Sequence, residues 1–357
     1  MLDSELLDIY SDYLISSFGQ TTATGLATLL NGSVSHDQIT RMLSGPAASS
    51  SALWQRVKPH VRGLQGPDGV VIIDDSIAAK PYTDENDLVC WHYDHTQGRH
   101  VKGINFVTAL YHRQNVSLPV GFALVTKTET YVDPKTEQLQ RRSAVSKNEL
   151  YRTLLRQAVH NQLPFAYVLN DVWYASAENM RFIKHELHKE FVMPLKANRK
   201  MALSPADKRS GRYVTVASLT LEPDTQQVIY LEEVAFPLGL IKHIYVNADG
   251  SEGVVYLVCS DSTAIAARIL ALHQTRWNIE PFHKSLKQNA ALTRSPTQTV
   301  NSQTNHLFAS FCGFIKLELL KRSHGLNQFA LRAQLYRQAL QTAFAALRAL
   351  QPQSLAA

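Results

Sequence analysis

Two short apolar runs, each leading to an aspartate, constrain the fold of this 357-residue chain more than any other feature. Residues 70–73 read Val-Val-Ile-Ile and run directly into Asp74 and Asp75. Residues 165–169 form a second run, which leads to Asp171. A continuous apolar run of this length is typical of a strand buried on both faces of a sheet. Because an acid at the end of a buried strand costs free energy unless it is solvated, paired or bound to metal, these two ends are candidate site positions.

The rest of this region alternates further strands with helices. Ser146 and Glu149 form a capping box that opens a helix between the two acid-ended strands. Residues 200–253 break the rhythm with short alternating segments and turn signals, which indicates a small β-rich insertion. The sequence therefore predicts a mixed α/β sheet. The other predicted elements are strands at residues 103–111, 120–125, 191–195 and 254–258 and a helix at 177–189, with a polar loop around 90–102.

Helical regions are expected on both sides of this core. We predict a helical region at residues 1–65, an α/β domain at 66–300 that contains the insertion, and a helical tail at 301–357. Within the first region, two short helices are separated by a turn at Asn31 and Gly32. The pattern fits a helix-turn-helix DNA-binding unit and equally a plain helical hairpin.

Composition narrows the classes of protein that this chain can belong to. Thirty-six Lys and Arg residues against 30 Asp and Glu give a net charge of +6, which suits a polyanionic partner without proving one. No apolar run approaches the roughly 18–20 residues that a membrane helix needs, and the first residues lack a secretory signal. The three cysteines are widely spaced and odd in number, which fits a reducing compartment. We therefore expect an intracellular protein that has no membrane partner.

A long helix predicted over residues 264–287 carries a third acid. At about 100° per residue, four charged residues share one stripe of this helix: Arg276, Glu280, Lys284 and Lys287. Taken alone, the stripe also fits a solvated helix face. Pro281 lies inside the helix and is expected to kink it beside Glu280, because proline removes a backbone hydrogen bond.

The residues around Glu280 resemble the Y-R-E-K signature of bacterial insertion-sequence transposases. That signature runs Tyr, two residues, Arg, three residues, Glu, six residues, Lys, and Arg276, Glu280 and Lys287 stand at this spacing. His273 holds the tyrosine position, which is a departure from the family pattern. Upstream, the stretches Ile-Asp-Asp-Ser at 73–76 and Leu-Asn-Asp-Val-Trp-Tyr-Ala-Ser at 169–176 resemble the two acidic strands of the same enzymes, so the resemblance covers about residues 66–300.

The resemblance implies a retroviral-integrase-like (RNase H-like) core with a catalytic DDE triad of Asp74, Asp171 and Glu280. Such a triad would hold two Mg²⁺ or Mn²⁺ ions, because hard cations prefer carboxylate oxygens. The Asp-x-Ser form common in this superfamily favours Asp74 as the first acid, and Asp75 is the alternative.

Cations and aromatic residues near the expected pocket are candidates for DNA contact. The predicted DNA-binding residues are His273, Arg276, Trp277, Lys284 and Lys287 of the signature helix, Lys196 and Arg199 after the strand at 191–195, Lys102, and Arg41 of the N-terminal region. Arg99 and His100, beside Lys102, would also suit phosphate contact.

The implied function is that of a DNA transposase that binds the terminal inverted repeats of its element. It would cleave DNA and transfer strands in a metal-dependent, cut-and-paste reaction through a hairpin. Its partners would be double-stranded DNA, as transposon ends and target, and a second copy of the chain on that DNA. It would act in the bacterial cytoplasm, at the nucleoid. Two alternatives stay open: a transposase-derived DNA-binding regulator, and a metal-dependent DNA nuclease without strand transfer.

Overall fold

The computed structural model describes residues 3–95, 97–134 and 137–350. The chain forms two compact units. The first unit consists of Met1–Arg56, Ala78–Ile104 and Phe282–Ala357, and the second consists of Val57–Ile77 and Asn105–Pro281. The predicted domain boundaries at residues 65 and 300 stay predictions.

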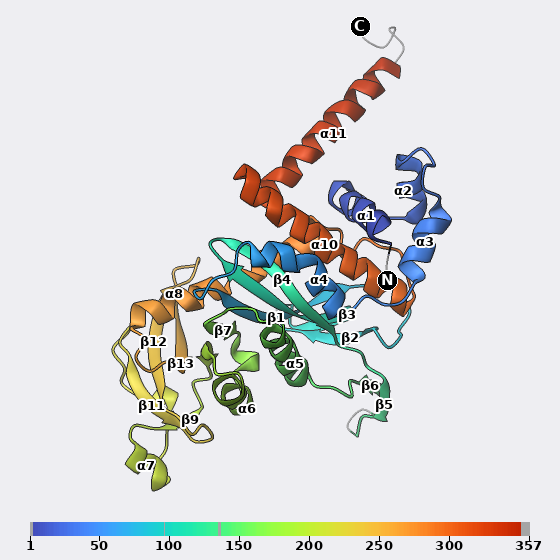
Figure 1. The fold of residues 1–357 in the computed structure, drawn as a ribbon. Helices are drawn as coiled ribbons and strands as arrows, with labels where there is room; N and C mark the ends of the chain where they lie inside the picture. Colours follow the sequence, from blue (N-terminus) through green and yellow to red (C-terminus); the bar gives the residue numbers. More distant parts are fainter. Residues whose placement is uncertain (1–2, 96, 135–136, 351–357) are drawn as a thin grey trace. The chain divides into compact units, whose positions relative to one another are not determined.

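The second unit is built on a large mixed β-sheet (Figure 1). Its strands are β1 (Val70–Ala79), β3 (Arg99–Arg113), β4 (Val116–Leu124), β7 (Tyr167–Asn170), β8 (Glu190–Leu195), β9 (Lys200–Ala202), β10 (Val214–Thr215), β11 (Gln227–Leu231), β12 (Leu238–Val246) and β13 (Glu252–Cys259). They follow the order β10-β9-β11-β12-β13-β8-β7-β1-β3, with β4 paired to β3. The pairs β1–β7 and β7–β8 are parallel, whereas β8–β13 and β3–β4 are antiparallel. The predicted mixed α/β class is therefore confirmed.

Helices cover this sheet and connect its strands. They are α5 (Lys147–His160), the 3-10 helix η1 (Val172–Tyr174), α6 (Ala177–Arg181), the π-helical turn η2 (Phe182–Glu186), α7 (Pro205–Arg209), the 3-10 helix η3 (Val216–Ser218) and α8 (Ala266–Arg276). The capping box of Ser146 and Glu149 opens α5 as predicted. Helix α5 packs on β4, and α8 packs on β7, β8 and β13. A separate hairpin consists of β5 (Glu129–Val132) and β6 (Leu139–Arg142).

The insertion at residues 200–253 is rich in short strands, from β9 to β12, as predicted. Figure 1 shows β11, β12 and β13 lying together beside α8. Within the insertion, β10 is only two residues long, because the chain turns after Thr215 into the 3-10 helix η3.

The predicted long helix at 264–287 is wrong in one respect, since it is two helices. Helix α8 ends at Arg276, Trp277 and Asn278 form a turn, and α9 (Ile279–Gln288) begins two residues before Pro281. Pro281 therefore lies in the first turn of α9, where backbone N–H groups have no acceptor within the helix. The chain bends before Glu280, and Pro281 is not the residue that kinks it.

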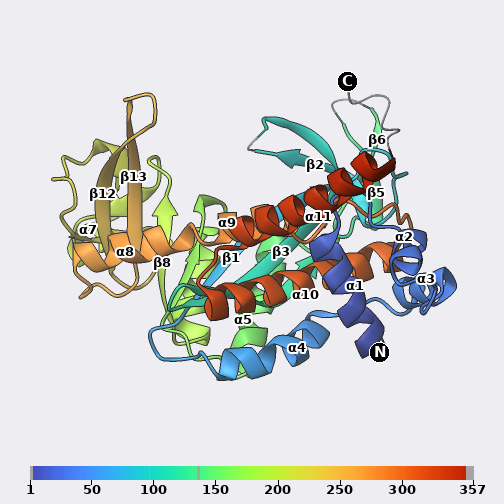
Figure 2. The same cartoon turned by 90° about the horizontal axis from the view of Figure 1, so that it is seen from above.

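The first unit is largely helical and is centred on α10. Its elements are α1 (Ser4–Ser16), α2 (Ala23–Leu29), α3 (His36–Ser44), the first residues of α4 (Ser50–Arg62), β2 (Val89–Asp94), the start of β3, most of α9, α10 (Val300–His324) and α11 (Gln328–Leu350). Helices α1 and α3 pack on α10, and Figure 2 shows α1 lying against it. Gly325, with a φ of 69°, ends α10 and separates it from α11. The tail is therefore two helices, and its predicted continuation over residues 351–357 lies outside the described residues.

Two further features of the first unit bear on the predictions. Helices α2 and α3 are separated by Asn31 and Gly32, both with positive φ, so the predicted helix pair is present. The polar loop expected around residues 90–102 is instead a β-ribbon of β2 and the start of β3. Among the described residues, no helix combines the length and apolar character needed to cross a membrane.

Candidate active site

Asp74 and Asp171 lie next to each other because their strands are parallel neighbours in register. Strand β1 pairs with β7, and the last pair in the register is Ile73 with Asn170. The next residue of the chain on each side is an aspartate. Neighbouring strands lie about 4.8 Å apart, so the two carboxylates stand in each other's field. Both side chains are partly buried, at the end of two otherwise fully buried apolar runs.

The surroundings of Asp74 and Asp171 raise the pKa of both carboxyl groups. Burial, together with the negative charges of Asp171 and Asp75, raises the pKa of Asp74 to about 8. Burial also raises the pKa of Asp171, with Asp75 adding to the rise, although the backbone N–H of Trp173 opposes it. Two carboxylates that resist ionisation together form a site that a cation would stabilise.

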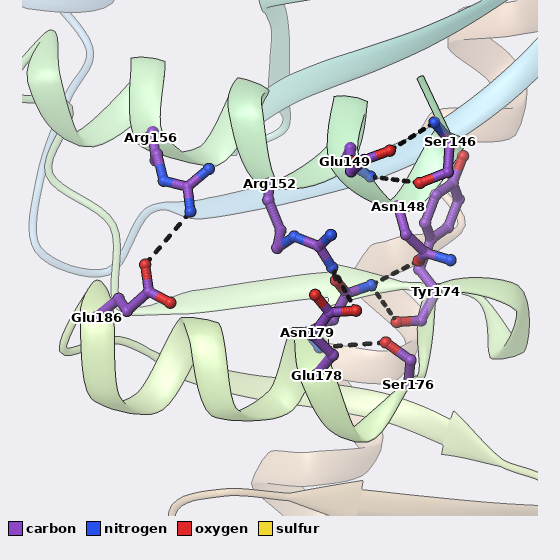
Figure 3. Close-up of polar contacts among 10 residues, drawn as sticks. All are labelled: Ser146, Asn148, Glu149, Arg152, Arg156, Tyr174, Ser176, Glu178, Asn179 and Glu186. Carbon is purple, nitrogen blue, oxygen red and sulfur yellow. Dashed lines mark hydrogen bonds and ion pairs between the residues drawn. The ribbon is translucent and has the colours of Figure 1, made fainter. Parts of the chain in front are cut away.

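A helix N-terminus and a polar network fix the orientation of Asp171. One of its oxygens caps η1 by accepting the backbone N–H of Trp173 at 3.0 Å and of Tyr174 at 3.4 Å. Behind it, Asn179 donates to the Tyr174 carbonyl at 2.9 Å and to the side chain of Asn148 at 2.7 Å (Figure 3). The segment after Asp171 is thereby tied to both α5 and α6.

Asp75 has partners of its own. Lys147 of α5 forms an ion pair with one carboxylate oxygen at 2.7 Å, and the Tyr174 hydroxyl donates to the other at 2.9 Å. Asp74, by contrast, accepts the backbone N–H of Asp75 at 2.8 Å. Both oxygens of Asp75 are therefore engaged by side chains, which leaves Asp74 as the better-placed ligand of the two.

Arg276, at the end of α8, is the cation that belongs to this cluster. Its charge lowers the pKa of both Asp74 and Asp171, so it acts on the two carboxylates together. Its side chain is only 12% exposed, and its Nε atom has no hydrogen-bond partner among the described residues. Glu280 forms an ion pair with Arg276 at 3.9 Å but is itself half exposed. The structure thus brings Asp74, Asp171 and Arg276 together and connects Glu280 to them through Arg276.

A cavity of about 990 Å³ adjoins this cluster between α8 and the β12–β13 hairpin. Its lining includes Asp171 and Arg276 and the exposed rings of Tyr245 and Trp277. His273 lines it as well, and burial lowers the pKa of this imidazole to about 4. His273 is therefore neutral at physiological pH and offers hydrogen bonds but no charge.

The other predicted contact residues are dispersed over the two units. In the second unit, Lys196 is exposed and Arg199 forms an ion pair with Glu233 at 3.7 Å. The remaining four lie in the first unit. They are Arg41, exposed on α3; Lys102, partly buried on β3; Lys284, exposed on α9 with its amine 5.3 Å from the Phe329 ring centre; and Lys287, partly buried, with a pKa that burial lowers.

A family comparison fits this arrangement of acids. The model of a family described as DDE superfamily endonuclease matches residues 3–229, which is more than half of the chain and includes both Asp74 and Asp171. The chain belongs to the DDE superfamily endonucleases. Glu280 lies beyond the matched residues.

The other comparisons assign no function to the chain. The crystal structure of Kluyveromyces polysporus Argonaute with a guide RNA is similar, with a TM-score of 0.25 and 12% sequence identity. The similarity covers 78% of this DDE endonuclease and 37% of the Argonaute chain, and similarity at this level assigns no function. A search of curated proteins finds no match.

DDE endonucleases generally use divalent metal ions, and the Asp74–Asp171 pair fits such an ion in part. Both residues offer hard oxygen ligands, and burial raises the pKa of each, so a bound cation would stabilise their ionised forms. Among the described residues, however, no three His, Cys, Asp or Glu side chains lie close enough together to hold one ion. Glu280, the third acid of the predicted triad, is paired with Arg276 in the structure.

Sequence reasoning missed the residues that hold the site in shape. Tyr174 and Lys147 engage Asp75, and Asn179 fixes the turn after Asp171. Only Tyr174 had a local signal, since it lies three residues after Asp171 in the stretch that resembles the family motif.

Proposed function

We propose that this DDE endonuclease is a DNA transposase of the bacterial insertion-sequence type. It binds the terminal inverted repeats of its element, cleaves DNA beside them in a cut-and-paste reaction through a hairpin, and transfers the strands to a target. The observation that carries the proposal is the Asp74–Asp171 pair with Arg276 beside it. The Y-R-E-K spacing of Arg276, Glu280 and Lys287 supports the assignment to this type.

The proposed chemistry follows from the charges at the site. DNA cleavage and strand transfer are in-line displacements at a phosphodiester, a centre that carries negative charge. Two Mg²⁺ or Mn²⁺ ions, when held by Asp74, Asp171 and Glu280, would activate the attacking oxygen and stabilise the leaving one. Arg276 would hold the phosphate through the donors that its guanidinium presents, because its Nε has no hydrogen-bond partner in the described part of the chain.

The proposed role of Glu280 depends on Arg276 exchanging this glutamate for a DNA phosphate. In the structure, Arg276 and Glu280 contact each other at 3.9 Å, a long distance for an ion pair. A DNA phosphate bound by Arg276 would release Glu280 toward the two aspartates. The catalytic triad would then be complete only when DNA is present.

The remaining predicted residues are proposed as DNA contacts outside the reacting centre. Trp277 and His273 would contact the DNA end from the cavity wall. The cations would contact the backbone: Lys284, Lys287, Lys196, Arg199, Lys102 and, on the predicted helix-turn-helix, Arg41. Such contacts position the duplex without reading its sequence.

We further propose that the protein acts as a homodimer on DNA in the bacterial cytoplasm. Beyond its first turns, α11 leaves α10 (Figure 1) and exposes large apolar side chains. Tyr336, Leu340, Leu347 and Leu350, with Ala343 between them, follow the alternating spacing of four and three residues that pairs helices. This stripe supports pairing with a second copy of the chain.

The test compares Glu280→Gln with Glu252→Gln, a matched change at an exposed glutamate of β13. Both proteins are incubated with Mg²⁺ and a duplex that carries candidate element ends, and the product strands are mapped. We expect Glu280→Gln to lose cleavage and keep end binding, and Glu252→Gln to cleave as the wild type does. Full cleavage by Glu280→Gln would contradict the triad.

A donor-plus-target assay separates transposase from simple nuclease. Joined donor–target products are expected from the transposase, whereas free ends without joined products would indicate a nuclease. DNA binding without any cleavage would indicate a regulator.

A further inference from the structure

The ribbon of β2 and the start of β3 displays aromatic and cationic side chains on one face. The register pairs Trp91 with Lys102 and Tyr93 with His100. Trp91 is 51% and Tyr93 47% exposed, whereas Cys90 and His92, between and beside them on the strand, are buried. Because side chains alternate between the faces of a strand, the two aromatic rings and their cross-strand partners share the outer face. Figure 2 shows the ribbon as a two-stranded hairpin.

Each aromatic ring on this outer face contacts a nitrogen-containing side chain of the neighbouring strand. The Lys102 amine lies 6.0 Å from the centre of the Trp91 ring, and the His100 ring meets the Tyr93 ring edge to face at 5.3 Å. Arg99 is exposed at the end of the ribbon, where its guanidinium is oriented by the Gln97 side chain at 2.8 Å. Two exposed rings with the permanent cations of Lys102 and Arg99 on the same ribbon are a pattern that binds bases by stacking and phosphates by charge.

We propose that this outer face, made of Trp91, Tyr93, His100 and Lys102, is a binding platform for unpaired DNA bases. Residues two apart on a strand are about 6.8 Å apart, twice the roughly 3.4 Å between stacked bases of a duplex strand. The two rings therefore suit successive bases that have left the helical stack. In a duplex the base faces are covered by their neighbours, so the platform selects single-stranded DNA.

The identification of DNA as the ligand of this platform rests on the proposed function. The platform would hold the strand segment that strand cleavage and exchange leave unpaired. The proposed reaction assigns no role to Trp91 and Tyr93, so binding at the platform and cleavage at Asp74 and Asp171 can be measured separately.

The first experiment measures the fluorescence anisotropy of a labelled oligodeoxythymidylate and of its duplex with oligodeoxyadenylate, at one fixed salt concentration. We expect Trp91→Ala/Tyr93→Ala to weaken single-strand binding by at least about tenfold and duplex binding by less than about twofold, since each base–aromatic stack contributes about 1–3 kcal/mol. The matched control is Tyr82→Ala, which removes a 98% exposed tyrosine from the same unit and should leave both affinities unchanged. Unchanged single-strand affinity of the double variant, or equal loss for single strand and duplex, would overturn the proposal.

A second measurement needs no substitution and so is independent of folding of the variant. An oligonucleotide containing 5-iodouracil is cross-linked to the wild-type protein by light, and the attached peptides are identified by mass spectrometry. Cross-links at Trp91 or Tyr93 are expected, and cross-links confined to other aromatic residues would refute the platform.

The outcomes also separate this proposal from the proposed function. A wild-type protein that cleaves duplex ends but binds no single strand would refute the platform and leave the transposase standing. A protein that binds single strands through Trp91 and Tyr93, yet whose Asp74→Asn variant cleaves normally, would support the platform and refute the proposed reacting centre.

Discussion

Asp74 and Asp75 are adjacent in the chain but differ in what they contact. Asp75 is held by Lys147 and Tyr174, whereas Asp74 faces the negative charge of Asp171. One aspartate therefore stabilises the fold and the other strains it. A site that destabilises the protein is common where a cation or substrate supplies the missing charge.

Substitutions at these two aspartates should shift stability in opposite directions. At pH 7, Asp74→Asn removes a carboxylate whose pKa is raised to about 8 in the folded protein, so it should stabilise by about 1–3 kcal/mol. Asp75→Asn breaks the ion pair with Lys147 and should destabilise by about 1–3 kcal/mol. The thermal unfolding midpoint, measured without metal, should rise for the first variant and fall for the second by a few degrees. A lower midpoint for Asp74→Asn would contradict the assignment of charge at the site.

His306 gives the first unit a dependence on pH. Its ring accepts the Tyr10 hydroxyl at 3.0 Å and donates to the Ala291 carbonyl at 3.0 Å, and burial lowers the pKa of the imidazole to about 3, with Lys80 adding to the effect. In the unfolded chain the pKa is about 6.5. Between these values the unfolded state binds the extra proton, so stability is complete above about pH 6.5 and falls as the pH drops toward 3.

The prediction is that, between pH 7 and pH 5, the wild type loses about 2 kcal/mol more stability than His306→Gln does. Urea unfolding followed by tyrosine and tryptophan fluorescence at both pH values measures the difference. Equal losses in both proteins would show that His306 is not the titrating group.

At the scale of elements, the break between α8 and α9 determines what Glu280 can reach. Because α8 ends at Arg276 and α9 begins at Ile279, Glu280 does not belong to the same helix as Arg276. The break also places Pro281 in the first turn of α9. Pro281→Ala should therefore change the free energy of unfolding by less than about 1 kcal/mol. In a continuous helix the same change would stabilise by about 3 kcal/mol, because the alanine restores a lost hydrogen bond. Chemical unfolding distinguishes the two values.

The sequence predicted those elements whose pattern is local. The apolar run at 70–73 became β1, the run ending before Asp171 became β7, and the capping box at Ser146 opened α5. It did not predict β2, because the polar residues His92 and Asp94 alternate with Trp91 and Tyr93 and interrupt any apolar pattern.

The sequence predicted which residues form the candidate site, but it did not predict which side chains hold Asp75 in place. The acids and Arg276 could be found from strand ends and from motif spacing. The partners of Asp75 lie 72 and 99 residues away along the chain, in Lys147 and Tyr174, and no local pattern reports such a distance. The pairing of Glu280 with Arg276, four residues apart, is by contrast a contact that the predicted helix stripe already placed side by side.

At the scale of the whole molecule, the exposed stripe of α11 bears on assembly. We expect the purified protein to form dimers in multi-angle light scattering, and Leu340→Asp/Leu347→Asp to be monomeric, because a charge in a helix seam is costly to bury. Gln338→Asp, a change to an exposed residue off the stripe, is the matched control and should stay dimeric. A wild type that is monomeric with and without end DNA would contradict the role given to α11.

The central claim is that Asp74 and Asp171 form the reacting centre, and Asp171→Asn tests it most directly. Asparagine keeps an oxygen to cap η1, so the variant should fold as the wild type does while losing one carboxylate charge. Cleavage of an end-containing duplex in Mg²⁺ is measured for both proteins under single-turnover conditions. We expect Asp171→Asn to lose at least about a thousandfold in rate with unchanged duplex binding. Cleavage within about tenfold of the wild-type rate would contradict the central claim.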